Sequence, residues 1–185
     1  FSNIPANLRV PLFYAEVDNS QANSGAQTQR TLIIGQVLAS GNAVVGVPVL
    51  GQGVTDAQAK GGQGSMLALM TAAYVAADQF GEVWFLPLAD AEGAVAAKGS
   101  VLIAGAPTTT GVVSLYIAGQ LISLTVATGE TPADIATALA KLINVSGNLP
   151  VTAVATAATV VLTAKNKGIA GNEIDLRLNY RGTPS

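Results

Sequence analysis

Hydrophobic and polar positions near the start of the chain follow a period of two. Phe13, Ala15 and Val17 alternate with more polar neighbours, and this alternation predicts a strand with one apolar face. Residues 19–28 are small and polar, a composition that is typical of a linker. A lone strand does not stabilise itself, so we expect this one to pair with the rest of the chain or with another chain.

Between residues 31 and 89 the pattern predicts strands and a helix in alternation. Residues 31–38 form a nearly continuous apolar run, which predicts a strand covered on both faces. Residues 65–79 have apolar positions at helical spacing, and Ser65 is placed to cap this helix. Residues 82–88 predict a second buried strand, with Trp84 in the core. The order strand, helix, strand predicts a parallel β-α-β unit, which is half of an open α/β sheet.

A hinge of mostly small residues, 90–99, separates this unit from a segment rich in Thr, Val and Ala, where we expect a second domain to start. Residues 111–116 and 121–126 predict the two strands of a hairpin. Thr131-Pro-Ala-Asp134 predicts the start of a helix with one apolar face. Three further strands are predicted at residues 151–155, 159–164 and 173–179. One antiparallel sheet with a helix across it satisfies these patterns.

Composition restricts the possible partners. Apolar residues make up 50% of the 185 residues and charged residues 11%, against roughly 25% charged in ordinary soluble domains. Little of the surface is therefore ionic, which leaves room for neighbouring subunits to cover part of it. The 9 basic and 11 acidic residues do not cluster, and this argues against nucleic acid and an anionic membrane as partners. Without cysteine there is no disulfide and no thiolate zinc site.

The stretch Gly61-Gly-Gln-Gly-Ser65 raises the question of a phosphate site. A Walker loop needs a lysine followed by Ser or Thr after its last glycine, but Gly64 is followed by Ser65 and Met66. A dinucleotide-binding loop needs a third glycine at the position of Leu67. We therefore predict that the stretch is a scaffold leading into a helix that Ser65 caps, and that it binds no cofactor.

Candidate catalytic groups are few. Histidine is absent, which rules out a Ser-His-Asp triad within this chain and removes the commonest nitrogen ligand for metals. Asp90 and Glu92 follow a strand, where α/β enzymes place catalytic carboxylates, but in a hinge we expect them to be solvated. Asp175, near Arg177, is expected to be an exposed charge, and residues 165–167 a loop between strands. No catalytic or metal site is predicted, and we do not expect an enzyme.

Several segments resemble a known family. Residues 4–20, Ile-Pro-Ala-Asn-Leu-Arg-Val-Pro-Leu-Phe-Tyr-Ala-Glu-Val-Asp-Asn-Ser, closely resemble the opening of Mu-like bacteriophage tail sheath proteins. Residues 62–70 and 82–88 resemble the first α/β segment of contractile-tail sheath proteins. Residues 129–136 and 162–176 resemble the inserted β-rich domain of that family. The resemblance covers almost the whole chain, and its opening is the most specific part.

This resemblance implies a fold class of α/β plus α+β. A partial subtilisin-like open α/β sheet would carry an inserted β-rich domain with one helix and be preceded by an extended N-terminal arm. Residues 1–30 would form the arm and linker, residues 31–96 the first part of the sheath core, and residues 97–185 the inserted domain. Subtilisin-like describes topology here and implies no protease activity. Family subunits are longer, so we expect this chain to be part of a longer protein.

The function implied by the resemblance is structural. The subunit would polymerise as stacked rings around the tail tube of a phage virion, after assembly in the host cytoplasm, and contract to drive genome ejection. Its partners would be other copies of itself, the tail tube protein, and the baseplate and tail terminator proteins, with no nucleic acid and no membrane contact. The arm would add a strand to a neighbouring subunit through Val10, Leu12, Phe13, Tyr14, Ala15, Glu16, Val17 and Asp18.

Two other classes remain open at this point. The Thr- and Val-rich segment is compatible with a β-rich surface-binding or adhesin-type module without enzymatic activity. Tyr116 and Tyr180 are the only aromatic residues after position 100, which counts against stacking on sugars. A hydrolase would need a histidine from sequence beyond Ser185.

Overall fold

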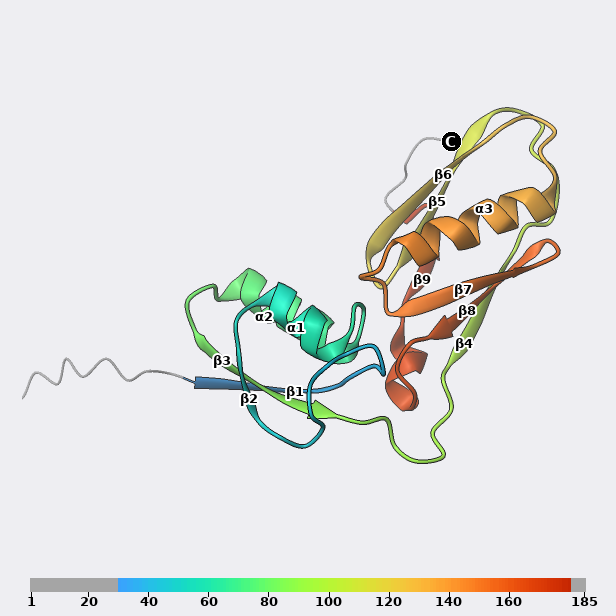
Figure 1. The fold of residues 1–185 in the computed structure, drawn as a ribbon. Coiled ribbons are helices and arrows are strands. Elements are labelled where there is room, and N and C mark those ends of the chain that lie inside the picture. The colour runs from blue at the N-terminus through green and yellow to red at the C-terminus, as the bar shows by residue number, and fades with distance from the viewer. Residues whose placement is uncertain (1–29, 181–185) are drawn as a thin grey trace, which may run out of the picture.

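The computed structural model describes residues 30–180, which form two regions (Figure 1). Each region has its own hydrophobic core. The first region, called the α/β layer below, has three strands and two helices: β1 (Arg30–Gln36), β2 (Val49–Gly51), α1 (Val54–Gly61), α2 (Met66–Ala77) and β3 (Glu82–Leu88). The two longer strands and α2 confirm the sequence predictions. The short elements β2 and α1 were not predicted.

The sheet of the α/β layer has the strand order β1-β3-β2. Strands β1 and β3 pair in parallel, as predicted, with Ile33 opposite Phe85, while β2 pairs with β3 in the antiparallel direction. Both helices lie on one face of this sheet (Figure 1). Gly35 allows α2 to approach closely, because a Cβ at this position would lie 2.7 Å from Leu67 Cα. Ile33, Leu67 and Phe85 form the core between helices and sheet.

The other face of this sheet is uncovered within residues 30–180, so the described part of the chain does not supply the predicted cover on both faces of these strands. Leu32 is 50% exposed and Ile34 46% exposed, and every second residue of β1 and β3 is more open than its neighbours. Trp84 was expected in the core but is only half-buried on this face. The physical reason is that an apolar run makes both faces of a strand suitable for burial, but it does not determine whether other segments cover them.

The second region, called the β-rich region below, contains β4 (Lys98–Leu102), β5 (Gly111–Ile117), β6 (Gln120–Val126), α3 (Pro132–Val145), β7 (Val151–Thr156), β8 (Thr159–Ala164), η1 (Ile169–Glu173) and β9 (Leu176–Leu178). Its strands form two antiparallel sheets, with orders β4-β8-β7 and β6-β5-β9. Helix α3 packs against strands of both sheets (Figure 1). The core between them includes Leu115, Leu139, Ile143 and Leu162, and burying each such side chain contributes about 1.5–3 kcal/mol.

The prediction of one antiparallel sheet was therefore wrong. The predicted strand at residues 173–179 is reduced to the three residues of β9, because Glu173 ends the 3-10 turn η1 and the ladder with β5 begins only at Leu176. Strand β4, which begins within the predicted hinge, pairs with β8 and makes no ladder with β9. Strand periodicity identifies the elements, but it does not specify their partners.

The local signals of the β-rich region are confirmed. The β5–β6 hairpin turns at Ala118 and Gly119, which both have positive φ, as a two-residue hairpin turn of type I′ requires. Thr131 caps α3 by accepting the N–H of Asp134 at 3.2 Å, and Pro132 stands at the first helical position.

Candidate functional site

The glycine-rich stretch lies between α1 and α2 and contacts the β-rich region. Gly64 has φ +74°, and a Cβ there would collide with the carbonyl oxygen of Leu149. The Lys165 amine donates to the carbonyl oxygens of Gln63 at 3.0 Å and of Gly147 at 2.7 Å. The loop that resembles a phosphate cradle therefore directs a carbonyl oxygen toward the Lys165 amine of its own chain. A carbonyl oxygen binds a cation, whereas a phosphate is an anion.

The first amides of α2 also have partners inside the protein. Ser65 Oγ accepts the N–H of Ala68 at 3.1 Å, and Asn166 Oδ1 accepts the N–H of Met66 at 2.9 Å. The N–H of Ser65 donates to Gly62 O at 3.2 Å. A phosphate at a helix N-terminus needs such N–H groups to be free. Their internal partners support the predicted scaffold role of the stretch.

Asp90 connects the two regions at the same place. Its carboxylate accepts hydrogen bonds from Gln36 Nε2 at 3.0 Å, Asn166 Nδ2 at 3.3 Å and the Lys167 N–H at 3.1 Å. The prediction that Asp90 is solvated was wrong, whereas Glu92 is exposed as expected. Asp90 lies two residues after the end of β3, so its carboxylate is located where the parallel strands β1 and β3 end, next to the loop after β8. We call this set of hydrogen bonds the polar joint.

Lys165 precedes Asn166 of the polar joint in the chain and is half-buried, and within residues 30–180 it has no carboxylate partner. Burial lowers the pKa of its amine, because desolvation penalises the charged form. Gly147 O lies just beyond the C-terminus of α3, where the carbonyl groups of a helix favour a cation. The lysine thus links the end of α3 to the loop before α2.

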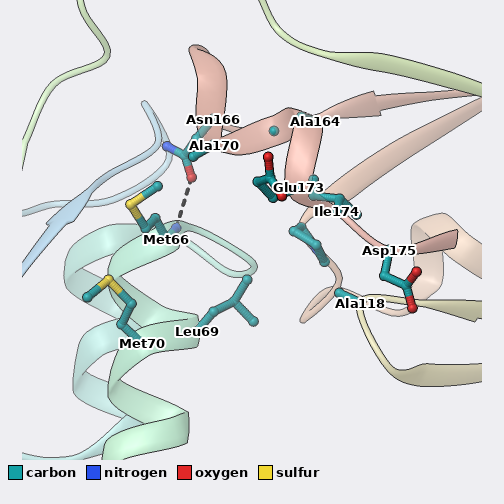
Figure 2. Close-up of a pocket in the computed structure, with 12 residues that line it drawn as sticks. Met66, Leu69, Met70, Ala118, Ala164, Asn166, Ala170, Glu173, Ile174 and Asp175 are labelled. Atoms are coloured by element: carbon teal, nitrogen blue, oxygen red, sulfur yellow. Dashed lines mark hydrogen bonds between the residues drawn. The ribbon is translucent and has the colours of Figure 1, made fainter.

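A cavity of about 300 Å³ lies beside the polar joint (Figure 2). Met66, Leu69 and Met70 of α2 form one wall. The opposite wall comes from residues 170–175, in and after η1, and includes Ile174. Figure 2 shows the bond from Met66 to Asn166 at the upper edge of this cavity. The lining is mostly apolar, and we call the cavity the junction groove.

The uncovered face of the first sheet is a second candidate surface, called the open face below. Besides Leu32 and Ile34 it exposes Leu50 and Leu88, and half-buried Trp84 lies among them. Trp84 Nε1 donates to Glu82 Oε1 at 2.7 Å, and Arg30 lies 3.0 Å from the same oxygen. The hydrogen bond from Trp84 is the main cause that lowers the pKa of Glu82, and the charge of Arg30 lowers this pKa further. Strands β1 and β2 each pair only with β3 among the described residues, so their outer edges are open to another strand.

Other sequence-predicted positions have the following places. The predicted arm residues, Val10 and Leu12 to Asp18, lie outside the described residues. Asp175 is exposed, as predicted, and forms an ion pair with Arg177 at 2.7 Å. Tyr116 is buried and Tyr180 is exposed, with the Arg177 guanidinium over its ring. Within residues 30–180 there is no metal-binding cluster of His, Cys, Asp and Glu, and no helix long and apolar enough to cross a membrane.

Sequence reasoning missed Asn166 and Gln36, the two amide side chains of the polar joint. A single asparagine or glutamine has no periodic pattern, and their partners are distant along the chain. The only available signal was the turn-like composition of residues 165–168, which indicated a loop and not its contact.

No family model matches this chain. It is 42% identical over 182 residues, or 97% of its length, to the Mu-like prophage FluMu tail sheath protein of Haemophilus influenzae. The resemblance to Mu-like tail sheath proteins is confirmed. The chain spans 37% of the length of this tail sheath protein. Because the match covers nearly the whole chain, it includes the α/β layer, the β-rich region and the polar joint between them.

Proposed function

We propose that this chain is part of a structural subunit of a contractile phage tail sheath. The observation that carries this proposal is the 42% identity to a tail sheath protein across both regions. The polar groups at the glycine-rich stretch and at Asp90 support a structural role, since they hold the two regions together. The subunit would polymerise around the tail tube, in the virion, and contract to drive genome ejection.

The open face supports the proposed domain division. Residues 31–96 would be the first part of a larger, subtilisin-like α/β core, and residues 97–185 an inserted β-rich domain. The uncovered side of a three-stranded sheet with exposed Leu32, Ile34 and Leu50 is a surface that further polypeptide stabilises by burial. That polypeptide would belong to the rest of the core or to a neighbouring subunit.

Residues 1–30 would act as an arm and linker between subunits. The segment Val10 to Asp18 would add a strand to a sheet of a neighbouring copy, with Phe13, Ala15 and Val17 on its apolar face. Among residues 30–180 the outer edges of β1 and β2 carry no further strand, which supports sheet edges of this kind as acceptors of such a strand. Repetition of one head-to-tail contact generates a helical tube in place of a closed dimer.

Contraction would be a switch between two packings of nearly rigid subunits, and it would need no cofactor. The linker, residues 19–28, would keep neighbouring copies connected while they reorient. The tail tube protein would contact the inner surface of the sheath. Baseplate and tail terminator proteins would contact the two ends of the sheath. These partners follow from the proposed sheath role.

Deletion of residues 1–20 from the complete gene product tests the arm. We expect the native protein to sediment as large assemblies and the truncated protein to remain in the supernatant. A matched control removes part of the linker, residues 21–25, and leaves Val10 to Asp18 in place. Normal assembly of the protein that lacks residues 1–20 would show that the arm assignment is wrong.

A further inference from the structure

Phe80 stands out as the most exposed large apolar residue of the described chain, at 97%. It lies in the turn between α2 and β3, and this turn is well ordered by hydrogen bonds. Asp78 Oδ1 accepts the N–H groups of Phe80 and Gly81, both at 3.1 Å, and Tyr74 OH donates to Asp78 Oδ2 at 3.0 Å. The aromatic ring is therefore presented to the outside on a fixed support, which lowers the entropy cost of binding it.

The junction groove has the size and chemistry to take such a ring. An apolar cavity of about 150 Å³ is enough for benzene, and the groove measures about 300 Å³. Both methionines of the chain, Met66 and Met70, line it. Methionine adapts its shape to a ligand, and a sulfur near an aromatic ring contributes about 0.3–1.5 kcal/mol.

Phe80 and the junction groove lie at opposite ends of α2. The helix has 12 residues, so it is about 18 Å long. Met66 is its first residue, whereas Phe80 follows its C-terminus. Figure 1 shows the turn before β3 at the end of α2 that points away from the β-rich region. Within one copy the ring and the groove cannot meet, but two copies can bring them together.

We propose that Phe80 of one copy inserts into the junction groove of a second copy, between Met70 and Ile174. This inference rests on the proposed sheath function and adds a specific subunit contact to it. The contact is heterologous, because the ring and the groove are different surfaces of the same chain. Each copy therefore leaves one ring and one groove free for the next copy, and the contact propagates in one direction.

The buried area indicates when this contact forms. A phenylalanine buries about 150–250 Å², whereas stable protein interfaces bury about 1,200–2,000 Å². The contact alone is too small to hold a dimer in dilute solution. It acts when other contacts, such as the arm, raise the local concentration of copies. We therefore expect a monomer at low concentration and the Phe80 contact at high concentration.

Cysteine cross-linking tests the contact, because the chain has no cysteine of its own. Gln79→Cys protein, which carries the cysteine next to an intact Phe80 ring, is mixed with Met70→Cys protein at high concentration and treated with a short bismaleimide. We expect a heterodimer band at least about fivefold stronger than that from Gln79→Cys mixed with Val154→Cys. Val154 is 63% exposed on β7 and serves as the control for random collisions. Equal bands would overturn the proposal.

A second measurement identifies other occupants of the groove. If a segment of the same chain fills it, the Met70→Cys thiol in monomeric protein will react with a maleimide more slowly than the Val154→Cys thiol, and the proposal is wrong. If the groove is free, both thiols react at similar rates in the monomer. The Met70→Cys thiol then becomes protected as the concentration rises, and Phe80→Ala abolishes this protection.

The outcomes separate this contact from the sheath function. Phe80→Ala should leave the melting temperature unchanged, because the side chain has almost no contacts within the copy. In one outcome, the complete gene product with Phe80→Ala forms normal tubes and the cysteine variants show no selective cross-linking. This result would overturn the contact and leave the sheath function standing. Selective cross-linking of a protein that forms no tubes would support the contact and contradict the sheath function.

Discussion

Asn166 Oδ1 accepts the N–H of Met66 at 2.9 Å, across 100 residues of sequence, and so caps helix α2 from the β-rich region. The amide of the same side chain donates to the Asp90 carboxylate. One asparagine thereby connects the start of α2, the end of β3 and the loop after β8. The two hydrophobic cores are separate, so such polar contacts are part of what joins the two regions.

Asn166→Ala removes both of these hydrogen bonds. It leaves the Met66 N–H without its cap and takes one donor from Asp90, which costs about 1–2 kcal/mol of the free energy of unfolding. We expect the melting temperature to fall by about 2–8 °C in a calorimetric scan. Asn172→Ala is the control, since Asn172 is exposed. Equal melting temperatures for the two variants would contradict the role of Asn166.

Gly64→Ala tests the close contact of the glycine-rich stretch with the β-rich region. An alanine at this positive φ lowers the free energy of unfolding by roughly 1–2 kcal/mol. Overlap of its Cβ with Leu149 O lowers it by roughly another 1–3 kcal/mol. Gly46→Ala is a matched control, because Gly46 has φ +77° and nothing within 4 Å of an added Cβ. Urea unfolding should therefore show a larger loss for Gly64→Ala. Similar losses would mean that the stretch is not pressed against the β-rich region.

Trp84, the single tryptophan, reports on Glu82 at the edge of the open face. The pKa of Glu82 lies below the usual 4.5, so the bonded carboxylate stabilises the folded state at neutral pH. This stabilisation is lost as the pH falls through the lowered pKa. We expect Trp84 fluorescence to titrate with a midpoint below 4.5. Glu82→Gln should abolish the transition. A midpoint at or above 4.5 would contradict the hydrogen bond.

The sequence predicted elements with strong local signals and missed those without them. Thr131 and Pro132 mark the start of α3, and β-branched residues are frequent in β5, β6, β7 and β8. Helix α1 has only Ala57 and Gly61 buried, so its apolar pattern is too weak to recognise. Strand β2 has three residues, which is too short for a period to show.

The candidate site was less predictable than the fold, for a physical reason. The polar joint combines Gln36, Asp90 and Asn166, which are separated by 54 and 76 residues and meet only after both regions have folded. The open face could not be foreseen either. The apolar run in β1 is the same whether helices cover one side or both.

Negative-stain electron microscopy of the complete gene product, expressed alone, tests the sheath assignment most directly. We expect hollow tubes or stacked rings built from many copies. Monodisperse monomers at every concentration would contradict it and would favour a surface-binding module with the same β-rich region.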